Sequence, residues 1–276
     1  MSVIPLTELL STGDHFIRIP ETRADRLEVR LAESTAELAA AQALRYAVFY
    51  DEMGAIPSPA MKAARRDFDQ FDSVCDHLLV IDHGLAPDEA VVGTYRLLRQ
   101  EVAEKHGGFY SASEYDISIL LARATKDQRI LELGRSCVHP AYRTNLTIQL
   151  LWRGISGYIF AHRIAYMIGC ASLPGTDPER HALALSYLYH EFLAPEDIRV
   201  RALPERFVEM NRIPRDKLPL RQALRGLPPL VKGYLRLGAF VGDGAVVDPQ
   251  FRTTDCFILL PVARLSERYM DRLDRE

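Results

Sequence analysis

The stretch LELGRSCVHPAYRTN, residues 131–145, decides the fold. Residues 130–138 alternate apolar and polar side chains in the manner of a β-strand, and Pro140 ends that pattern. The chain then passes through Tyr142 and Arg143 into a helix-like stretch from about residue 145 to 162. A helix that begins just after a strand offers free backbone N–H groups to a phosphate or a developing oxyanion. The stretch therefore predicts a strand–helix unit with an anion-binding junction.

The segments on either side predict a mixed sheet. Strand patterns occur at residues 27–31, 77–82, 90–98, 165–172 and 256–262, and helical patterns at 35–53 and 178–192. Ser34 is the expected N-cap of the first helix, the linker 83–89 favours a hairpin, and the Pro-interrupted segment 56–73 is expected to be a loop. Antiparallel strands followed by a strand–helix–strand–helix unit predict an α/β fold of the α+β kind, with a largely antiparallel sheet flanked by helices.

The composition favours one domain with a substantial core. The chain has 276 residues, of which 48% are hydrophobic and 26% charged. We expect a single domain over 1–276, divided into an N-terminal arm (1–26), a core (27–198), and a basic segment with a C-terminal extension (199–276). The formal net charge of −3 argues against binding a polyanion through bulk charge, so no nucleic-acid partner is expected.

The cysteines and the apolar segments argue for a cytoplasmic location. The four cysteines are widely separated and form no CxxC pair, so neither a disulfide framework nor a metal site is expected. The first twenty residues lack a basic region followed by an apolar core, and no stretch approaches the ~18 apolar residues of a membrane span. We therefore expect a protein that is neither exported by this route nor integral to a membrane.

Segment 199–236 differs in charge from the rest. It contains eight arginines and two lysines but three acidic residues, which gives a local net charge of +7. Within it, apolar and basic side chains alternate in an amphipathic pattern: Leu220, Leu224, Leu227, Val231 and Leu235 against Arg221, Arg225, Lys232 and Arg236. Such a stretch binds an anionic inner membrane peripherally or docks an acidic protein. The competing interpretation is a helix that packs on its own core with a solvated basic face.

Val138, Pro140, Tyr142 and Arg143 resemble the acyl-donor motif of the GNAT acyltransferases, Val-x-Pro-x-Tyr-Arg. In that family the motif is followed by glycines that cradle the pyrophosphate of coenzyme A. Here Thr144, Leu146 and Ile148 occupy those places, and their side chains would obstruct a pyrophosphate. The resemblance therefore implies a GNAT-like fold with no bound cofactor, in which the acyl donor is carried on the phosphopantetheine of an acyl carrier protein.

Further motifs narrow the resemblance. Four of them follow in the order found in acyl-homoserine lactone synthases: Arg45 with Phe49, Asp69-Gln-Phe-Asp72, Gly93-Thr-x-Arg96-Leu97, and Glu132-x-x-Arg135. The length and the C-terminal sequence resemble instead the L-ornithine N-alpha-acyltransferases, over roughly residues 27–265. That family implies transfer of a 3-hydroxyacyl group from acyl carrier protein to the α-amine of L-ornithine, giving lyso-ornithine lipid. The alternatives are acyl-homoserine lactone synthesis from S-adenosylmethionine, or a non-catalytic module that binds acyl carrier protein or membrane.

Amine acylation needs a base and groups that position the substrates. Glu132 is the expected base or proton relay; alternatively it is a surface carboxylate or forms a salt bridge with Arg135. Arg96 and Arg135 are expected to bind the pantetheine or the substrate carboxylate, or only to neutralise neighbouring acids. The resemblance assigns Val138, Tyr142 and Arg143 to the acyl donor.

The remaining candidates are three charged residues nearer the N-terminus. Asp69 and Asp72 suit the ammonium groups of a dicationic amino acid, or form a solvated acidic loop. Arg45 lies on an apolar-rich helix and should have a carboxylate partner, unless it lies on the helix surface. Cys137 is disfavoured as a nucleophile because only His139 is near it in the sequence.

Overall fold

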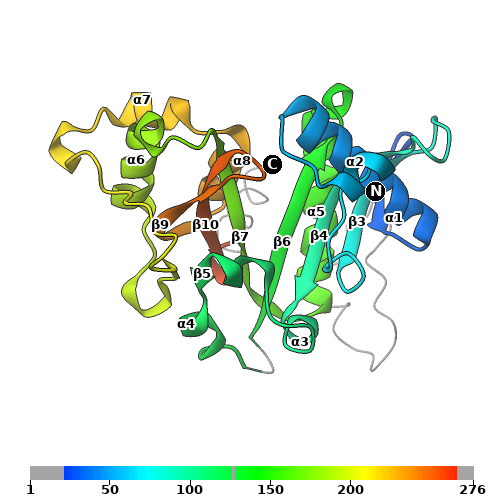
Figure 1. Cartoon of the computed structure of the whole chain (residues 1–276). Helices are drawn as coiled ribbons and strands as arrows, with labels where there is room; N and C mark the ends of the chain where they lie inside the picture. Colours follow the sequence, from blue (N-terminus) through cyan, green and yellow to red (C-terminus); the bar gives the residue numbers. More distant parts are fainter. Residues whose placement is uncertain (1–21, 126–127, 266–276) are drawn as a thin grey trace.

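The computed structural model describes residues 22–125 and 128–265 (Figure 1). Most of the expected N-terminal arm, residues 1–21, lies outside them. Within these ranges ten strands form one sheet. From edge to edge they are β1 (Thr22–Ala24), β2 (Leu27–Leu31), β3 (Asp76–Asp82), β4 (Val91–Arg99), β6 (Arg129–Val138), β7 (Ile164–Pro174), β10 (Thr253–Pro261), β9 (Phe240–Asp248), β8 (Arg201–Ala202) and β5 (Tyr115–Asp116). Only β6–β7 and β8–β9 pair in parallel among these strands, which confirms the expected mixed, largely antiparallel sheet.

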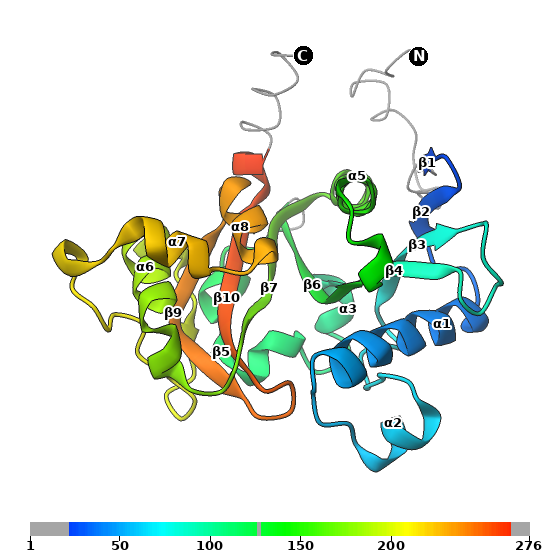
Figure 2. The same ribbon diagram turned by 90° about the horizontal axis from the view of Figure 1, so that it is seen from above.

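Helices cover both faces of the sheet (Figure 2). The α-helices are α1 (Thr35–Tyr46), α2 (Pro59–Ala64), α3 (Gln100–Ala103), α4 (Ser118–Leu121), α5 (Asn145–Ala161), α6 (Ala182–Phe192), α7 (Leu220–Gly226) and α8 (Pro229–Arg236). A π-helix, η2 (Ala47–Glu52), continues α1, and the 3₁₀ turns are η3 (Tyr110–Ser113), η4 (Pro140–Tyr142), η5 (Pro178–His181), η6 (Glu196–Ile198) and η7 (Arg215–Lys217). Ser34 caps α1 as expected, its Oγ accepting from the Glu37 N–H at 3.2 Å.

The alternation of side chains along the strands divides the core between the two faces. Leu78 and Val80 of β3 share a buried cluster with residues of α5, α6 and α8. Leu79 and Ile81 point to the opposite face and pack with α1, where Leu44 is buried. Each face of β3 is thus covered by a different helix layer.

The sheet splays apart between its two central parallel strands. Pairing of β6 with β7 ends at Glu132 and Ile168, after which both strands continue without pairing to each other. Gly169 follows at once, and a Cβ there would lie 2.4 Å from the carbonyl oxygen of Leu133, so only glycine fits this close approach. Beyond this point, the backbone N–H and C=O groups on the facing edges of β6 and β7 form no hydrogen bonds between the two strands.

The structure corrects several element predictions. Segment 56–73, expected to be a loop, holds α2, and β9 is a strand that the sequence did not predict. The amphipathic stretch is two helices separated at Leu227 and Pro228, so Leu227, Val231 and Leu235 are buried whereas Leu220 and Leu224 are exposed. Among the described residues, no helix combines the length and apolar character required to cross a membrane.

Candidate active site

A buried ion-pair cluster lies between α1 and the loop that precedes β3. Arg45 of α1 has no exposed surface. Its Nε lies 2.8 Å from Asp67 Oδ2, and its Nη2 donates to Asp72 Oδ1 at 2.7 Å and to the Asp67 backbone carbonyl at 2.6 Å. Arg45 therefore has the carboxylate partner that the apolar helix required, and it does not lie on the helix surface.

Two further arginines join this cluster from the paired strands β4 and β6. Arg96 Nη1 donates to Asp69 Oδ1 at 2.6 Å, and Arg135 Nη2 donates to Asp69 Oδ2 at 3.1 Å. Arg135 Nε donates to Asp67 Oδ2 at 3.3 Å. Burial opposes ionisation of Asp69, but Arg96 and Arg135 outweigh it and hold the pKa of that carboxyl below its ordinary value.

A β-bulge turns Arg135 toward this cluster. The β4–β6 register shifts between Thr94 and Arg96, and Arg135 has a left-handed φ of +49°. Simple alternation would direct Glu132 and Arg135 to opposite faces of the sheet, whereas the bulge lets both serve the same face. This local distortion is what assembles the site from one strand.

Aromatic rings pack against the guanidinium groups of Arg96 and Arg135. The Arg135 guanidinium lies 5.0 Å from the Tyr110 ring centroid and 4.6 Å from that of Phe251. Phe251 sits in the turn between β9 and β10, and this turn contacts the N-terminal half of the chain because the Ile56 N–H donates to the Gln250 carbonyl at 2.8 Å. Figure 2 shows that hairpin reaching toward α1 and α2. The C-terminal extension thus covers residues of the N-terminal half.

Glu132 of β6 is buried beside this cluster, with 4% of its surface exposed. Its Oε2 accepts from the Tyr110 N–H at 2.7 Å and its Oε1 from the Ser111 N–H at 2.8 Å. Burial raises the pKa of Glu132, and these donors oppose the rise. Glu132 is neither a surface residue nor the partner of Arg135, which binds Asp67 and Asp69 instead.

Three more acids converge near the same face. One carboxylate oxygen each from Glu114, Asp248 and Asp255 lies within 4.8 Å of the other two, and all three residues are buried. Burial and the neighbouring Asp255 raise the pKa of Glu114 to about 7, although Arg206 opposes the shift. We call Glu114, Asp248 and Asp255 the acidic trio.

The residues assigned to the acyl donor lie at the junction of β6 and α5. Tyr142 donates to Asp82 Oδ2 at 2.6 Å. Arg143 binds Glu52 through both Nη atoms at 2.7 Å, and its Nε donates to the Val138 carbonyl at 3.2 Å. Thr144 caps α5, its Oγ1 accepting from the Thr147 N–H at 3.3 Å. Tyr142 and Arg143 therefore brace the junction in this structure.

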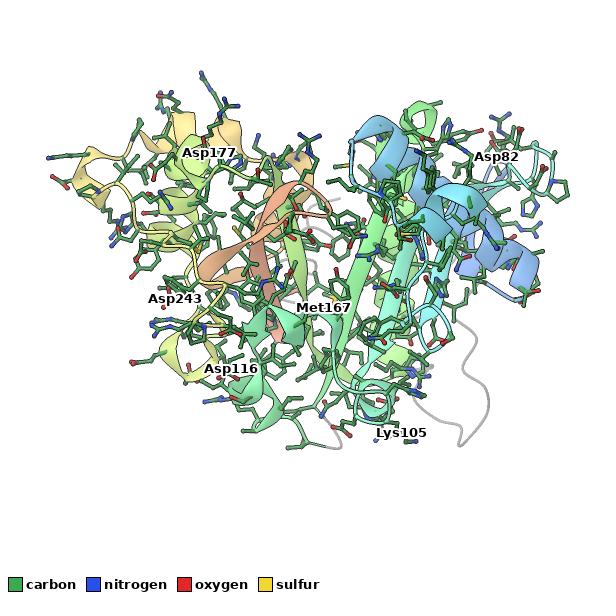
Figure 3. The ribbon with its side chains drawn as sticks, viewed as in Figure 1. Asp82, Lys105, Asp116, Met167, Asp177 and Asp243 are labelled. Carbon is green, nitrogen blue, oxygen red and sulfur yellow. The ribbon has the colours of Figure 1, made fainter. Side chains whose placement is uncertain are left out.

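An apolar pocket opens where β6 and β7 diverge. Its lining includes Leu133 of β6, Met167 and Gly169 of β7, Tyr234 of α8, and Ile258 and Leu260 of β10. Met167 marks its position near the middle of the sheet (Figure 3). Cys137 lies apart from this pocket on buried β6, and burial raises the pKa of its thiol to about 12, so the thiolate nucleophile is scarce.

Sequence reasoning found part of this site. The structure brings together Arg45, Asp69, Asp72, Arg96, Arg135 and Glu132, whereas Val138, Tyr142 and Arg143 lie at the separate strand–helix junction. The sequence analysis did not identify Asp67, Tyr110 or the acidic trio as site residues. Asp67 had a signal, since it opens the Asp-Phe-Asp-Gln-Phe-Asp run; the trio had none, because Glu114 is far from Asp248 and Asp255 along the chain.

Comparison with known proteins gives consistent matches. Residues 44–153 match the model of the acetyltransferase (GNAT) domain. The chain is 53% identical over 251 residues to the L-ornithine N(alpha)-acyltransferase of Rhizobium meliloti (strain 1021), covering 90% of this chain and 84% of that protein. The protein of the same name from Brucella abortus (strain 2308) is 52% identical, covering 94% of this chain and 92% of the relative. The one from Rhodobacter capsulatus is 42% identical, with 88% and 93% covered.

A solved structure supports the fold. FeeM, an N-acyl amino acid synthase from uncultured soil microbes, superposes with a TM-score of 0.50, covering 89% of this chain and 96% of that chain. At 10% sequence identity this similarity concerns the fold alone.

Proposed function

The chain belongs to the L-ornithine N(alpha)-acyltransferase family, and from this premise we propose that it transfers a 3-hydroxyacyl group from acyl carrier protein to the α-amine of L-ornithine. The product is lyso-ornithine lipid, the intermediate formed in the first step of ornithine lipid synthesis. The observation that carries the proposal is 52–53% identity to relatives of this name over nearly the whole chain. The GNAT-type fold and a buried cluster of acids and arginines are consistent with it.

The reaction needs little activation of its acyl donor. The amine nitrogen attacks the thioester carbonyl, an N–C bond forms, and the C–S bond breaks. The nitrogen loses a proton, and the departing thiolate of the carrier takes one up, so no other reactant is required. The protein must therefore hold the amine neutral and close to the carbonyl, and stabilise the oxyanion.

Glu132 is the proposed proton acceptor, acting directly or through water. Burial beside the β6–β7 splay raises its pKa, which makes it a stronger base than an exposed carboxylate. The backbone N–H groups of Tyr110 and Ser111 fix the orientation of its carboxylate. A fixed, desolvated carboxylate suits proton abstraction from an ammonium that arrives in the same enclosed site.

Arg45, Asp69, Asp72, Arg96 and Arg135 are the proposed substrate-binding residues. Arg135 and Arg96 offer guanidinium groups to the substrate carboxylate or to the pantetheine, from a site where aromatic rings limit access of water. Asp69 links the two arginines and Asp72 binds Arg45, so these carboxylates set the positions of the cations. For Asp69 or Asp72 to bind an ammonium group of ornithine, that carboxylate would have to bind the ammonium together with its arginine partner or release the arginine.

The splay between β6 and β7 is the proposed route of the phosphopantetheine arm. The β6 edge beyond Glu132 does not pair with β7, so its backbone groups are available to the amides of the arm. The apolar pocket that includes Leu133 and Met167 adjoins this edge; its volume is about 10 Å³, so an acyl chain enters there only if the lining side chains move apart. Val138, Tyr142 and Arg143 lie at the far end of β6, where the phosphate would reach the start of α5.

The exposed face of α7 is the proposed docking site of the acyl carrier protein. Leu220 and Leu224 are 45% and 42% exposed, and the exposed Arg221 and Arg225 border a surface hollow beside them. Acyl carrier proteins are acidic, so charge complementarity favours this occupant. Peripheral contact with an anionic inner membrane uses the same chemistry and is the competing outcome.

Mass spectrometry of a reconstituted reaction tests the function. Purified protein is mixed with 3-hydroxyacyl carrier protein and, separately, with ornithine, lysine, glutamine and S-adenosylmethionine. We expect mono-acylated ornithine and an equal amount of free carrier. A lactone formed from S-adenosylmethionine would move the assignment to acyl-homoserine lactone synthesis, and carrier binding without any product would favour the non-catalytic module.

A further inference from the structure

The acidic trio gathers from three separate parts of the chain. Glu114 follows the η3 turn, Asp248 ends β9, and Asp255 lies within β10, with 3%, 8% and 7% of their surfaces exposed. One carboxylate oxygen of each lies within 4.8 Å of those of the others. Like charges held this close out of water repel each other strongly, so the arrangement calls for a compensating cation.

Asp255 has one carboxylate oxygen without a donor, although hydrogen bonds from the side chains of Thr253 and Ser172 to the same carboxyl group lower its pKa against the effect of burial. Its Oδ1 is buried and has no hydrogen-bond partner among the described residues. A buried carboxylate oxygen without a partner is costly, and native proteins rarely leave one. The oxygen therefore indicates a ligand that brings a donor.

Within residues 22–125 and 128–265, the cations near the acidic trio do not balance its charge. Arg206 Nη2 reaches Glu114 Oε1 at 3.3 Å, and Arg135 is already bound to Asp67 and Asp69. Asp248 Oδ1 accepts only from the neutral N–H groups of Gln250 and Phe251, at 2.7 and 2.9 Å. Negative charge remains in excess, and the raised pKa of Glu114 indicates that a proton partly compensates it.

A primary ammonium fits this arrangement better than a metal ion does. An ammonium carries three N–H donors, and three residues each present a carboxylate oxygen. Calcium requires six to eight oxygen ligands, and magnesium keeps several of its waters in an octahedron. The thiol of Cys170, 3.5 Å from Glu114 Oε2, is a poor ligand for either hard cation and a weak donor that an ammonium readily displaces.

The acidic trio adjoins the proposed reaction site through the η3 turn. Tyr110 and Ser111 bind Glu132, and Glu114 follows at the end of the same 3₁₀ turn. Three residues of such a turn span roughly 6 Å. The two nitrogens of ornithine are separated by about 6 Å when its chain is extended, from standard bond lengths. An amino acid with its α-amine near Glu132 would thus bring its terminal ammonium to the acidic trio.

Building on the function proposed above, we propose that Glu114, Asp248 and Asp255 form the subsite for the side-chain ammonium of the acceptor amino acid. The acidic trio then selects a diamino acid over an apolar amino acid of the same length. Phe251 and Tyr110 separate this subsite from Arg135, since the Phe251 N–H binds Asp248 while its ring faces Arg135. The acidic trio therefore governs acceptor specificity and leaves proton transfer to Glu132.

Comparing ornithine with norvaline tests the proposal. Norvaline has the same carbon chain without the terminal amine, so the wild-type protein should acylate it with kcat/KM at least about 100-fold lower. Asp255→Asn should raise KM for ornithine about tenfold or more and leave the low rate with norvaline unchanged. Equal kcat/KM values for the two amino acids in the wild-type protein would overturn the proposal, while ornithine acylation itself would still support the proposed function.

Matched controls distinguish an ammonium subsite from a metal site and from a general loss of folding. Asp243→Asn removes an equally buried aspartate of β9 that is bound to Arg201 and is not part of the acidic trio (labelled in Figure 3), and it should not alter the ornithine-to-norvaline ratio. Glu114→Gln provides a second variant if Asp255→Asn does not fold. Loss of activity in EDTA, restored by Mg²⁺ or Ca²⁺, would overturn the proposal in favour of a metal site. Absence of product from ornithine would count against the proposed function itself.

Discussion

At the scale of single residues, the role proposed for Glu132 as proton acceptor makes a direct prediction. Glu132→Gln keeps one oxygen for the N–H groups of Tyr110 and Ser111 but cannot accept a proton. We expect kcat to fall by about 100-fold or more, in the range typical of a lost general base. Single-turnover acylation of ornithine measures the effect. If Glu132 had only a structural role, the variant would have a lower melting temperature and a kcat within about tenfold of the wild-type value. The control is Glu104→Gln, a substitution at an exposed site.

The ion pairs of Arg45 predict a stability effect. Arg45→Met leaves Asp67 and Asp72 buried without their main cation, and breaking a buried pair in this way costs about 3–5 kcal/mol. Urea denaturation should show that loss in the free energy of unfolding. Arg65→Met removes an exposed pair with Asp51 and should change stability by less than about 1 kcal/mol. Equal effects of the two substitutions would contradict a structural role for Arg45.

Residue types and spacing revealed only part of this site. Arg45 stood out because a charged residue within an apolar helix needs a carboxylate partner, but only the structure identifies Asp67 and Asp72 as its partners. The acidic trio escaped because its members are acids in ordinary polar surroundings along the chain. Only the antiparallel pairing of β9 with β10, together with the η3 turn, brings them together.

At the scale of elements, the divergence of β6 and β7 depends on Gly169. In Gly169→Ala the added Cβ would lie 2.4 Å from the Leu133 carbonyl oxygen, so the strands must shift at the end of their pairing. We expect a loss of about 1–3 kcal/mol in the free energy of unfolding, as for other overpacked sites, together with reduced activity. Gly226→Ala, where an added Cβ meets no atom within 4 Å, should be neutral or stabilising. Equal stabilities of the two variants would refute the steric argument.

The exposed face of α7 predicts a selective effect on the acyl donor. Arg221→Glu with Arg225→Glu reverses charge beside Leu220 and Leu224 without touching the buried face of the helix. KM for acyl carrier protein should rise about tenfold, with a weaker salt dependence, while KM for ornithine stays unchanged. Lys105→Glu, an exposed site at the opposite end of the molecule, is the control (Figure 3). Loss of vesicle binding with an unchanged KM for the carrier would assign this face to the membrane instead.

Long periodic segments were predictable, and irregular ones were not. The strands and helices expected within residues 27–53, 77–98 and 130–192 follow clear apolar periods, and the structure confirms them within a few residues. β9 was missed because FVGDGAVVD contains two glycines and two aspartates, which are uncommon in strands. The bulge at Arg135 was not predicted, because the alternation of apolar and polar residues along this strand gives no sign of an irregular residue. Its positive φ depends on pairing with β4 and not on local preference.

At the scale of the whole molecule, the two halves of the sheet contribute unlike parts of one site. The N-terminal half supplies Arg45, Asp69 and Arg96, and the C-terminal half supplies Asp248 and Asp255. The strand β6 and the η3 turn join them through Glu132 and its N–H donors. A substrate that bridges the halves is therefore expected to stabilise the whole protein against unfolding.

Glu114 predicts how stability depends on pH. Its pKa rises from an ordinary 4.5 to about 7 in the folded protein, because burial and Asp255 and Asp248 outweigh Arg206. The folded state then holds more protons than the unfolded state between these values. This stabilising contribution is full below pH 4.5 and is lost as the pH rises through 7, about 3 kcal/mol in all. Lowered carboxyl pKa values, as at Asp69, act in the opposite direction below about pH 4.

Comparing thermal unfolding of the wild-type protein with Glu114→Gln between pH 5 and 8 isolates this contribution, because His77 and the other groups that titrate are common to both proteins. The wild type should lose stability relative to the variant across this range. If the acidic trio binds an ammonium, that cation takes the place of the proton on Glu114 and lowers its pKa. Saturating L-ornithine should then flatten the pH dependence of the wild-type protein, whereas norvaline should not. If ornithine leaves the pH dependence of the melting temperature unchanged, its ammonium binds elsewhere and the acidic trio exchanges only protons.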